Sequence, residues 1–374
     1  MYGIFVFILY QLMVSLINMF FIRRPDKKYL TDGLKVSVLV PARNEEEKIQ
    51  SCVESLLKQD YQNIEIIVLD DNSSDETFNL LKSLHDDRLK IIKSEEEPPL
   101  GWMGKNWACY RLYVASSGDI LIFVDADTYL SSDAVSTMVG TMQLNNLDFI
   151  TGIPREEMYT FGEKITIPFV NFSVLSIFPV FLGLISKYFY FFLFGNGQFM
   201  MFKREAYEKI HGHESVKGEV VEDIALSKAA KKNGLKVGIF NLSGLVSCRM
   251  YKNFKEAFFG LSKSYAGLFD FRLIPSLFVW TWMIVITIFP IFNAILSNDH
   301  LIRFFSIASI FATLFVWMIT SIKFDLPKII LILSPLITLV NSLIGFVSMF
   351  LLLTGRSLWK GRVVEKKKFK LLIF

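Results

Sequence analysis

The sequence predicts an α/β fold in which a mostly parallel sheet with flanking helices is joined to transmembrane and interfacial helices. Between residues 34 and 267, β-branched runs that end in polar residues alternate with helical patterns, as in proteins with parallel sheets. Apolar stretches of about 20 residues, the length that spans a bilayer, lie toward both ends of the chain. The 374-residue chain therefore combines a water-facing domain with a membrane part.

Strands and helices are expected to alternate along the water-facing domain. Four strands are expected at Lys35–Val40, Ile64–Leu69, Leu89–Lys93 and Asp119–Val124. Apolar residues at helical spacing predict helices at Ile49–Lys58, Ser74–Leu84, Asn106–Ser116 and Val220–Asn233. Asn44 followed by Glu47 has the spacing of a capping box, which predicts an N-cap for the first helix. In such sheets ligands bind at the carboxyl ends of the strands, so the polar residues there are functional candidates.

The N-terminal residues 1–22 contain no charge and are followed by Arg23, Arg24, Lys27 and Lys28. This pattern favours a retained transmembrane anchor over a cleaved signal peptide, because there is no basic n-region and no small-residue cleavage site. Basic residues after a span place that end in the cytosol. The water-facing domain, residues 34–267, is therefore expected on the cytoplasmic side of the plasma membrane.

Three more apolar stretches lie toward the C-terminal end, at residues 275–297, 301–322 and 329–354, and a basic tail follows at residues 355–374. Three full spans would place the basic tail outside the cell, against the positive-inside rule. One of the stretches within residues 275–354 is therefore expected to be re-entrant or interfacial. The stretch interrupted by Pro335 and Asn341 is the first candidate.

A further apolar run at residues 165–194 is rich in Phe and Tyr and is interrupted by Pro168, Pro179 and Lys187. The interruptions favour helices that lie in the membrane interface, where aromatic rings and lysine are common. The middle of the water-facing domain is therefore expected to contact the lipid bilayer.

Charge is distributed unevenly along the chain. Residues 34–163 carry 11 Lys and Arg against 23 Asp and Glu, a net charge of −12, whereas the rest of the chain carries a net charge of +16. A nucleic-acid-binding domain would itself be basic, so nucleic acid is not expected as a partner. An acidic block between basic flanks favours a cation-using domain beside an anionic membrane. The three cysteines, Cys52, Cys109 and Cys248, fit neither a disulfide framework nor a zinc pattern.

Two carboxylates, Asp125 and Asp127, follow the fourth expected strand with one residue between them. Hard carboxylate oxygens suit Mg²⁺ or Mn²⁺, which bind one or two carboxylates together with substrate phosphates. The alternative is a polar strand end that caps the next helix. Asp70 and Asp71 follow the second strand and also suit a turn. Because both pairs lie at strand ends of one sheet, the sequence favours a functional site there.

Lys105 and the pair Glu222–Asp223 are further candidates. Lys105 stands beside glycines at an expected helix start, where a lysine can contact phosphate oxygens, although the glycine spacing is not that of a Walker A loop. A solvated lysine is the alternative. Two acids at a helix start often only complement the helix dipole. One of them could act as a general base if it faces the strand ends.

Six motifs occur in the order and rough spacing of a known family: VPARNEEEKI, VLDDNSSDET, GWMGKNWA, FVDADT, GNGQFMMFKREAY and VVEDIALSKAAKKNG. Over roughly Lys35 to Gly267 the chain resembles glycosyltransferase family 2. It is most similar to the lipid-modifying membrane branch, which includes 4,4'-diaponeurosporenoate and hopanoid-associated glycosyltransferases, and Trp359–Lys360–Gly361–Arg362 also looks like that branch. The resemblance implies a GT-A (Rossmann-like) fold, a nucleotide-sugar donor, in the first place a UDP-sugar, and a divalent metal, Mg²⁺ or Mn²⁺.

The resemblance also implies roles for individual residues. The positions matching the nucleotide-sugar site are Pro41, Ala42, Arg43, Glu45, Asp71 and Asp125, with Lys105 nearby. Asp125 and Asp127 match the metal and diphosphate positions, and Asp223 matches the general base. The positions on the acceptor and diphosphate side are Gly197, Gln198, Glu222, Arg249 and Lys263.

Processive synthases of this family carry a Gln/Arg-x-x-Arg-Trp motif, which this chain lacks. Arg249–Met250–Tyr251, Lys263 and Tyr265 occupy that region. The resemblance therefore implies inverting transfer of a single sugar to a carotenoid acid, a hopanoid or another membrane lipid. Two alternatives stay open: transfer to polyprenyl phosphate, and a non-catalytic membrane scaffold with a degenerate transferase domain.

Overall fold

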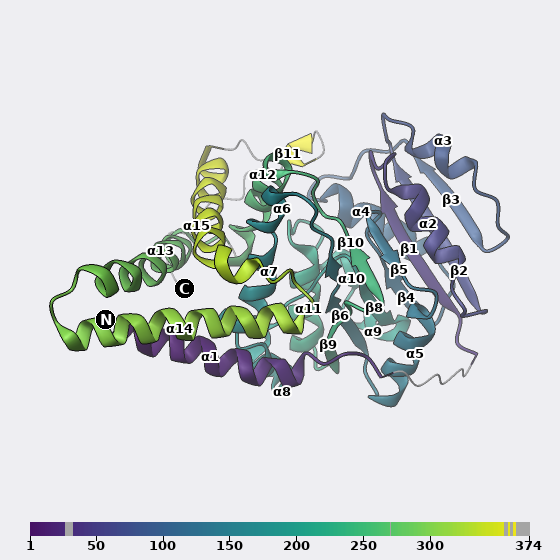
Figure 1. Ribbon diagram of the computed structural model, residues 1–374. Coiled ribbons are helices and arrows are strands. Elements are labelled where there is room, and N and C mark those ends of the chain that lie inside the picture. Colours follow the sequence, from purple (N-terminus) through teal and green to yellow (C-terminus); the bar gives the residue numbers. More distant parts are fainter. Residues whose placement is uncertain (27–32, 270, 355–357, 360–361, 364–374) are drawn as a thin grey trace. The chain divides into compact units, whose positions relative to one another are not determined.

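The computed structural model describes residues 1–26, 33–269, 271–354, 358–359 and 362–363, and the chain divides into two compact units. The first, which we call the sheet unit, comprises Phe21–Glu157 and Val180–Arg249. The second, which we call the helical unit, comprises Met1–Phe20, Met158–Pro179 and the residues from Met250 onward. Figure 1 shows the strands of the sheet unit and the long helices of the helical unit.

The sheet unit is built on a seven-stranded sheet in the order β3-β2-β1-β4-β8-β6-β9. Its strands are β1 (Val36–Ala42), β2 (Ile64–Asp71), β3 (Leu89–Ser94), β4 (Ile120–Phe123), β6 (Phe149–Ile153), β8 (Met200–Lys203) and β9 (Val237–Asn241). All neighbouring strands are parallel except where β8 pairs with β4 and β6. The predicted fold class is therefore confirmed, and each of the four expected strands overlaps one of β1 to β4.

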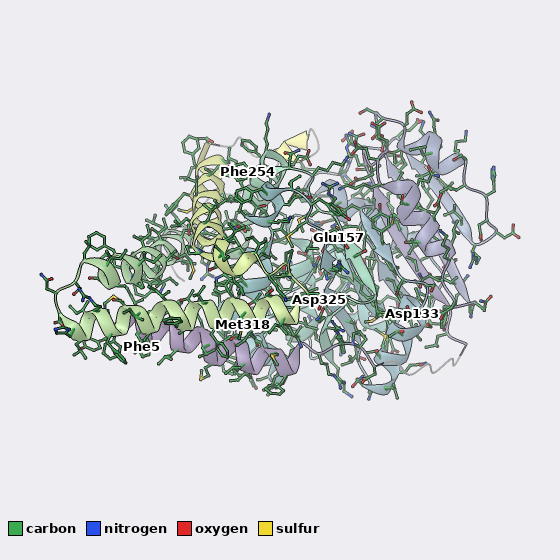
Figure 2. The ribbon with its side chains drawn as sticks, in the orientation of Figure 1. Phe5, Asp133, Glu157, Phe254, Met318 and Asp325 are labelled. Atoms are coloured by element: carbon green, nitrogen blue, oxygen red, sulfur yellow. The ribbon has the colours of Figure 1, made fainter. Side chains whose placement is uncertain are left out.

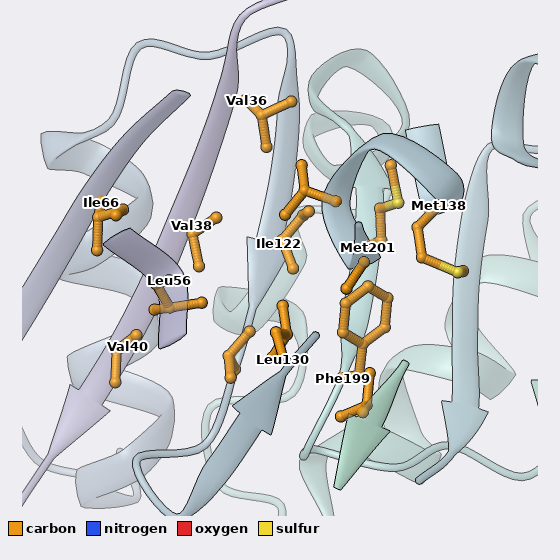
Figure 3. Close-up of a cluster of buried hydrophobic side chains, with 14 of the residues drawn as sticks. Val36, Val38, Val40, Leu56, Ile66, Ile122, Leu130, Met138, Phe199 and Met201 are labelled. Atoms are coloured by element: carbon orange, nitrogen blue, oxygen red, sulfur yellow. The ribbon is translucent and has the colours of Figure 1, made fainter. Parts of the chain in front are cut away.

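The strands of this sheet are apolar at consecutive positions because both faces of the sheet are covered. In β1 every residue except Pro41 is buried, which requires apolar side chains at consecutive positions rather than at alternate ones. Val38 and Val40 contribute to a core that also contains Leu56 and Ile122 (Figure 3). The polar residues at the strand ends are left at the edge of this core.

Short helices and a second sheet complete the sheet unit. The helices are α2 (Ile49–Leu57), α3 (Thr77–Lys82), α4 (Gly104–Ala115), α5 (Ala134–Leu144), α8 (Val180–Ile185), a 3₁₀ helix (Lys187–Phe192), α9 (Arg204–Lys209), α10 (Gly212–Ser215) and α11 (Glu222–Lys232). The second sheet has the order β5-β10-β7, with β5 (Thr128–Leu130), β10 (Val246–Cys248) and β7 (Arg155–Glu156).

The helical unit contains four helices that, among the described residues, are long and apolar enough to cross a membrane. They are α1 (Tyr2–Phe21), α13 (Leu273–Leu296), α14 (His300–Lys323) and α15 (Ile330–Thr354). Shorter elements accompany them: α6 (Phe161–Lys164), α7 (Pro168–Phe172), a π-helix (Ser173–Ile177), α12 (Phe254–Ser264) and a 3₁₀ helix (Gly267–Phe269). Figure 2 shows mostly carbon side chains along α13 and α14, and more nitrogen and oxygen atoms over the strands.

Pro335 and Asn341, which interrupt the last apolar stretch in the sequence, both lie inside the unbroken helix α15. Pro335 is the sixth residue of the helix, so its missing N–H leaves out one backbone bond, to Leu331, without ending the helix. Asn341 keeps helical geometry and uses its side chain for other contacts: its amide donates to Thr166 O at 3.0 Å, and its oxygen accepts from the Tyr265 hydroxyl. The way in which α15 lies in a membrane stays a prediction.

Some expectations fall on residues that the structure does not describe. Lys27 and Lys28, after the expected anchor, lie outside the described residues. So does the basic tail at residues 355–374, apart from the short strands β11 (Leu358–Trp359) and β12 (Arg362–Val363). The domain boundaries and the cytoplasmic orientation expected from the sequence therefore stay predictions.

Candidate active site

Arg43 and Asp71 come together at the carboxyl ends of β1 and β2. The parallel register pairs Ala42 with Asp70, so the residues that follow are neighbours. Arg43 Nη1 donates to the Asp71 carbonyl oxygen at 2.6 Å and lies 3.7 Å from Asp71 Oδ2. Asp71 is buried and Arg43 is partly buried. The two residues form a charged pair at the edge where nucleotide binding was predicted.

The other residues predicted on the nucleotide side lie beside this pair. Pro41 and Ala42 are the last two residues of β1. The backbone N–H of Glu45 donates to Thr77 Oγ1 at 2.8 Å, which joins the loop after β1 to the start of α3. These residues therefore gather at one edge of the sheet.

Asn44 does not cap α2, so the predicted capping box is wrong. Asn44 has a φ of 51°, a left-handed conformation that asparagine tolerates better than most residues. Its Oδ1 accepts from Ser74 N at 2.8 Å, and its own N–H donates to Ser73 Oγ at 2.9 Å. Helix α2 begins only at Ile49, and Lys48 before it makes no capping bond through its side chain. The Asn44 side chain therefore binds to the loop after β2 instead of capping α2.

Asp125 and Asp127 follow β4, and each carboxylate faces a lysine. Lys105 Nζ lies 2.7 Å from Asp125 Oδ1, and Lys48 Nζ lies 3.4 Å from Asp127 Oδ2. Burial and the charge of Asp125 raise the pKa of Asp127, and Lys48 opposes this rise. The two carboxylates therefore repel each other, and each is paired with a lysine at the start of a different helix, Lys105 of α4 and Lys48 before α2.

Lys48 is a site residue that the sequence analysis did not single out. Its Nζ donates to the carbonyl oxygen of Arg249 at 3.1 Å in addition to its pairing with Asp127. Burial lowers the pKa of Lys48, but the charges of Asp127 and Glu45 outweigh burial and raise it overall. No local pattern marks this residue, because a lysine after three glutamates resembles a solvated helix start.

Lys105 connects the end of β4 to the start of α11. Its Nζ lies 2.8 Å from Glu222 Oε1 as well as 2.7 Å from Asp125 Oδ1. Burial lowers the pKa of Lys105, but Asp125 and Glu222 outweigh it, and the pKa is held well above its usual value. The lysine therefore stays charged between two carboxylates, and its contact with donor phosphate stays a prediction.

Gly197 brings the segment before β8 against these charged groups. Its N–H donates to Asp223 Oδ2 at 2.9 Å. A Cβ at this position would lie 2.7 Å from Lys105 Nζ and 3.4 Å from Asp125 Oδ2. A side chain at this position would therefore displace the flexible end of the lysine that faces Asp125.

Asp223 is the second residue of α11. Its Oδ1 accepts from Ile224 N at 2.8 Å, and Oδ2 accepts from Gly197. Burial and the charge of Glu222 raise the pKa of Asp223 to about 7, while Lys105 and the backbone donors limit the rise. A carboxylate with a pKa near 7 can take a proton from a substrate at neutral pH, which fits the role predicted for it.

A row of buried residues in the second sheet adjoins Asp127. The register places Thr128, Cys248 and Glu156 side by side on β5, β10 and β7. Gln198 Nε2 donates to Cys248 Sγ at 2.9 Å, so this predicted acceptor-side residue is buried against the sheet. Burial and the charge of Asp127 raise the pKa of Glu156 to about 8. Glu156 carries no local signal in the sequence, because it stands in a charged run that resembles an exposed loop.

Two residues predicted on the acceptor and diphosphate side lie in different units. Arg249 is the last residue of the sheet unit, and its carbonyl oxygen accepts from Lys48. Lys263 lies in α12 of the helical unit. The structure therefore brings the Arg249 backbone to the Asp127 side of the site, whereas the role of Lys263 stays a prediction.

Asp125 and Asp127 fit a divalent cation by their donor chemistry. Carboxylate oxygens are ligands that Mg²⁺ and Mn²⁺ prefer, and after burial the charge of Asp125 is the largest cause of the raised pKa of Asp127. A cation near both would relieve that repulsion. Within the described part of the chain, no group of three or more His, Cys, Asp and Glu side chains is arranged to hold a metal. A metal here would therefore take its other ligands from substrate phosphates and water.

The fold defines the class of protein. A mostly parallel seven-stranded sheet with one antiparallel strand, flanked by helices, is a GT-A-like fold. The structure is similar to that of the mannosyltransferase PcManGT from Pyrobaculum calidifontis in complex with GDP-Man and Mn²⁺, with a TM-score of 0.51 and 14% identity. The likeness covers 93% of this chain and 98% of the mannosyltransferase. At this identity it shows the fold alone.

The family follows from the sequence match. Residues 37–211 match Glycosyl transferase family 2. The matched range includes Arg43, Asp71 and Asp127, and it ends before the helix that carries Asp223. The resemblance stated from the motifs is therefore confirmed.

Curated relatives match the chain at 27% and 28% identity. The 4,4'-diaponeurosporenoate glycosyltransferase of Staphylococcus aureus (strain USA300) is 27% identical over 223 residues, which cover 58% of this chain and 56% of the relative. The protein of that name from Staphylococcus haemolyticus (strain JCSC1435) is 28% identical over 242 residues, covering 62% and 61%. The chain thus spans little more than half the length of these relatives.

Proposed function

We propose that this protein transfers a single sugar, with inversion, from a nucleotide-sugar, in the first place a UDP-sugar, to a membrane lipid such as a carotenoid acid or a hopanoid. The family supports sugar transfer from such a donor. The four apolar helices and the name of the curated relatives support a lipid acceptor. The observation that carries the proposal is the convergence of Lys105, Asp125 and Asp223 on Gly197 in a family 2 domain.

On the donor side of this proposal, Arg43 and Asp71 bind the nucleoside, and Asp125 and Asp127 hold Mg²⁺ or Mn²⁺. The metal, when bound, supplies positive charge that stabilises a nucleoside diphosphate leaving group. Lys105 adds a second, permanent positive charge at the same edge, since its pKa lies well above its usual value. The donor is therefore held where the charge of the leaving group is compensated.

On the acceptor side, Asp223 accepts the proton of an acceptor hydroxyl. The acceptor oxygen forms a bond to the anomeric carbon of the sugar, and the bond from that carbon to the diphosphate breaks. The N–H groups of Gly197 and Ile224 hold the two carboxylate oxygens of Asp223 in place. An acceptor carboxylic acid, with a pKa of about 4–5, is already ionised at pH 7 and needs no such base.

The decisive experiment is mass spectrometry of membrane lipids from cells with and without this protein, supplied with candidate UDP-sugars. A new lipid that carries one hexose supports the proposal and identifies sugar and acceptor. A sugar found on polyprenyl phosphate would instead support that alternative acceptor. The absence of both a lipid product and UDP-sugar hydrolysis would contradict enzymatic activity and favour a scaffold.

The metal is tested by calorimetry with UDP and Mn²⁺ on the full-length protein and on Asp127→Ala. We expect UDP affinity to fall in the variant, because one of two carboxylates for the metal is removed. Mg²⁺ in place of Mn²⁺ shows which metal is preferred. Unchanged UDP affinity would contradict the metal role of Asp127 without affecting the assignment of the family.

We also propose that the helices lie in the plasma membrane with the sheet unit in the cytoplasm. Arg23 and Arg24, directly after α1, support this orientation through the positive-inside rule. Protease digestion of the sheet unit in inside-out vesicles but not in right-side-out vesicles is the expected result. The reverse pattern would contradict the orientation.

A further inference from the structure

An exposed apolar surface lies on the sheet unit at the end of α8 and along the 3₁₀ helix that follows. Four large side chains within Ile185–Phe191 are exposed, which we call the aromatic edge: Ile185 (65%), Tyr188 (77%), Phe189 (40%) and Phe191 (49%). Val114 on α4 is also exposed, at 63%, but it has no such neighbours in the sequence. A cluster of this kind marks an interaction surface, whereas single exposed apolar residues are ordinary.

The charges of the segments that form this surface are all positive. Val180–Gly195 contains one charged residue, Lys187, and the part of α11 after Asp223 contains lysines but no Asp or Glu: Lys228, Lys231 and Lys232. Lys187 Nζ lies 5.7 Å from the ring centroid of Tyr188, and Lys232 Nζ lies 5.9 Å from that of Tyr190. This positive charge stands in contrast to the net charge of −12 on residues 34–163.

The aromatic edge is formed next to the point where the chain leaves α1. Phe181 of α8 contacts Phe21, the last residue of α1, with ring centroids 6.0 Å apart. Arg23, two residues after Phe21, is bound to the end of β9, because Asn241 N donates to Arg23 O at 2.9 Å. Since α1 is long and apolar enough to cross a membrane, its end marks a membrane surface.

Helix α11 connects the aromatic edge to the candidate base. Near the end of the helix, Lys231 Nζ donates to Leu184 O of α8 at 2.5 Å. At its start lies Asp223, whose carboxylate accepts from Gly197. At about 1.5 Å per residue, the eight positions between Asp223 and Lys231 correspond to about 12 Å, which is less than half the thickness of the hydrocarbon core.

We propose that the aromatic edge docks the sheet unit on the surface of an anionic phospholipid bilayer and thereby presents the head of the lipid acceptor to Asp223. Aromatic rings settle at the level of the headgroups, and lysines close to the surface are attracted to anionic lipids. The presentation of an acceptor rests on the proposed function. The docking itself does not.

The test measures the depth of one labelled position in the full-length protein. The three native cysteines are all buried, so an introduced cysteine can be labelled selectively with the fluorophore NBD. Tyr188→Cys reports on the aromatic edge, and Val114→Cys, on the same unit and similarly exposed, is the matched control. Both proteins are placed in nanodiscs of phosphatidylglycerol and phosphatidylcholine, with and without spin-labelled lipid.

We expect spin-labelled lipid to quench the fluorophore at position 188 at least about twofold more than at position 114. Replacing phosphatidylglycerol by phosphatidylcholine, or introducing Lys187→Glu with Lys232→Glu, should reduce this difference, because the attraction to anionic lipid is lost. Equal quenching at the two positions overturns the proposal. Energy transfer between labelled copies without quenching by lipid also overturns the proposal, because the aromatic edge would then be covered by a second copy of the protein.

UDP-sugar turnover measured on the same samples separates this inference from the proposed function. Quenching at position 188 without any turnover supports docking and contradicts the proposed transfer. Turnover without quenching contradicts docking and leaves the transfer in place.

Discussion

The sheet unit and the long helices of the helical unit bury polar groups in different ways. In the sheet unit, ionisable groups are held together as charges, as in the cluster of Lys105 with Asp125 and Glu222. In the long helices, the buried polar side chains among the described residues are neutral. Many of them donate to the carbonyl four residues earlier, as Thr338 and Ser342 do at 3.0 and 2.9 Å.

The difference indicates where chemistry takes place. A neutral group that is hydrogen-bonded within its own helix costs little to bury and has a fixed protonation state. A buried carboxylate held by a lysine is costly, and its pKa departs from the ordinary value. Groups of this kind cluster at functional sites, so changes in the sheet unit should act on catalysis and pH dependence. Changes in the long helices should act on stability alone.

The largest expected effect is that of Asp223→Asn. With a hydroxyl acceptor, we expect kcat to fall by about 10²–10⁴, the usual contribution of a general base. Donor affinity, measured by calorimetry, should stay unchanged, because the asparagine can still occupy the site beside Gly197. Substantial activity on an acceptor carboxylic acid would indicate that the acceptor is already ionised. Thr338→Val in α15 is the control, and a comparable loss of kcat there would contradict the distinction between the units.

Glu156→Gln should stabilise the protein increasingly as the pH rises. Burial and the charge of Asp127 raise the pKa of folded Glu156 from 4.5 to about 8. The contribution of this proton to stability is complete below the unfolded pKa and is lost as the pH rises toward the folded pKa. The glutamine carries no such pH-dependent penalty.

Thermal unfolding in detergent measures this prediction. The Tm of Glu156→Gln should exceed that of the parent protein most at pH 8 and approach it toward pH 4–5, in line with the pKa range of 4.5 to about 8. A difference in Tm that does not vary with pH would show that Glu156 does not hold a proton in the folded state.

Gly197→Ala should reduce kcat/KM by about tenfold to a hundredfold, because a small displacement of catalytic groups has effects of that size. The added Cβ would lie 2.7 Å from Lys105 Nζ, so the lysine must move away from Asp125. Gly244→Ala is the matched control in the same unit, since a Cβ there meets nothing within 4 Å. Steady-state kinetics of both variants, with Tm measured alongside, would reveal whether a loss is local. Equal activity of the two variants would contradict the close approach.

The smallest effect is expected for Asn341→Leu in α15. The variant loses the bonds to Tyr265 and Thr166, and an intramolecular hydrogen bond contributes about 0.5–1.5 kcal/mol to stability. Unfolding in detergent should show a lower stability of that size at every pH from 5 to 8. UDP affinity should not change. A pH-dependent loss, or a loss of UDP binding, would mean that the long helices take part in the site.

The sequence predicted those site residues whose signal is local. The β-branched runs before Asp71 and Asp125 identify buried strands, and the polar residues after them mark the edge where parallel strands end. The fold class and the carboxylates could therefore be placed without a structure. The pair Glu222–Asp223 was singled out as two acids at a helix start, and the resemblance to the family selected Asp223 as the candidate base.

The residues that were missed depend on partners far along the chain. Lys48 acquires its role from Asp127, and Glu156 acquires its raised pKa mainly from burial and then from Asp127. Asn44 follows a local capping pattern, but its side chain is taken by Ser74 of another loop. Pro335 has the features of a helix breaker and yet lies within α15. In each case tertiary contacts outweighed the local pattern.

The position of β8 restricts the order in which the chain can fold. This strand, Met200–Lys203, lies between β4 and β6 and joins, in the sheet that the structure describes, the β3-β2-β1-β4 half to the β6-β9 half. During synthesis both β4 and β6 are made well before β8, so their inner edges stay unpaired until about 50 further residues follow β6. Met158–Pro179, which belongs to the helical unit, is made within that interval. A ribosome that pauses before residue 200 would therefore leave the inner edges of β4 and β6 open.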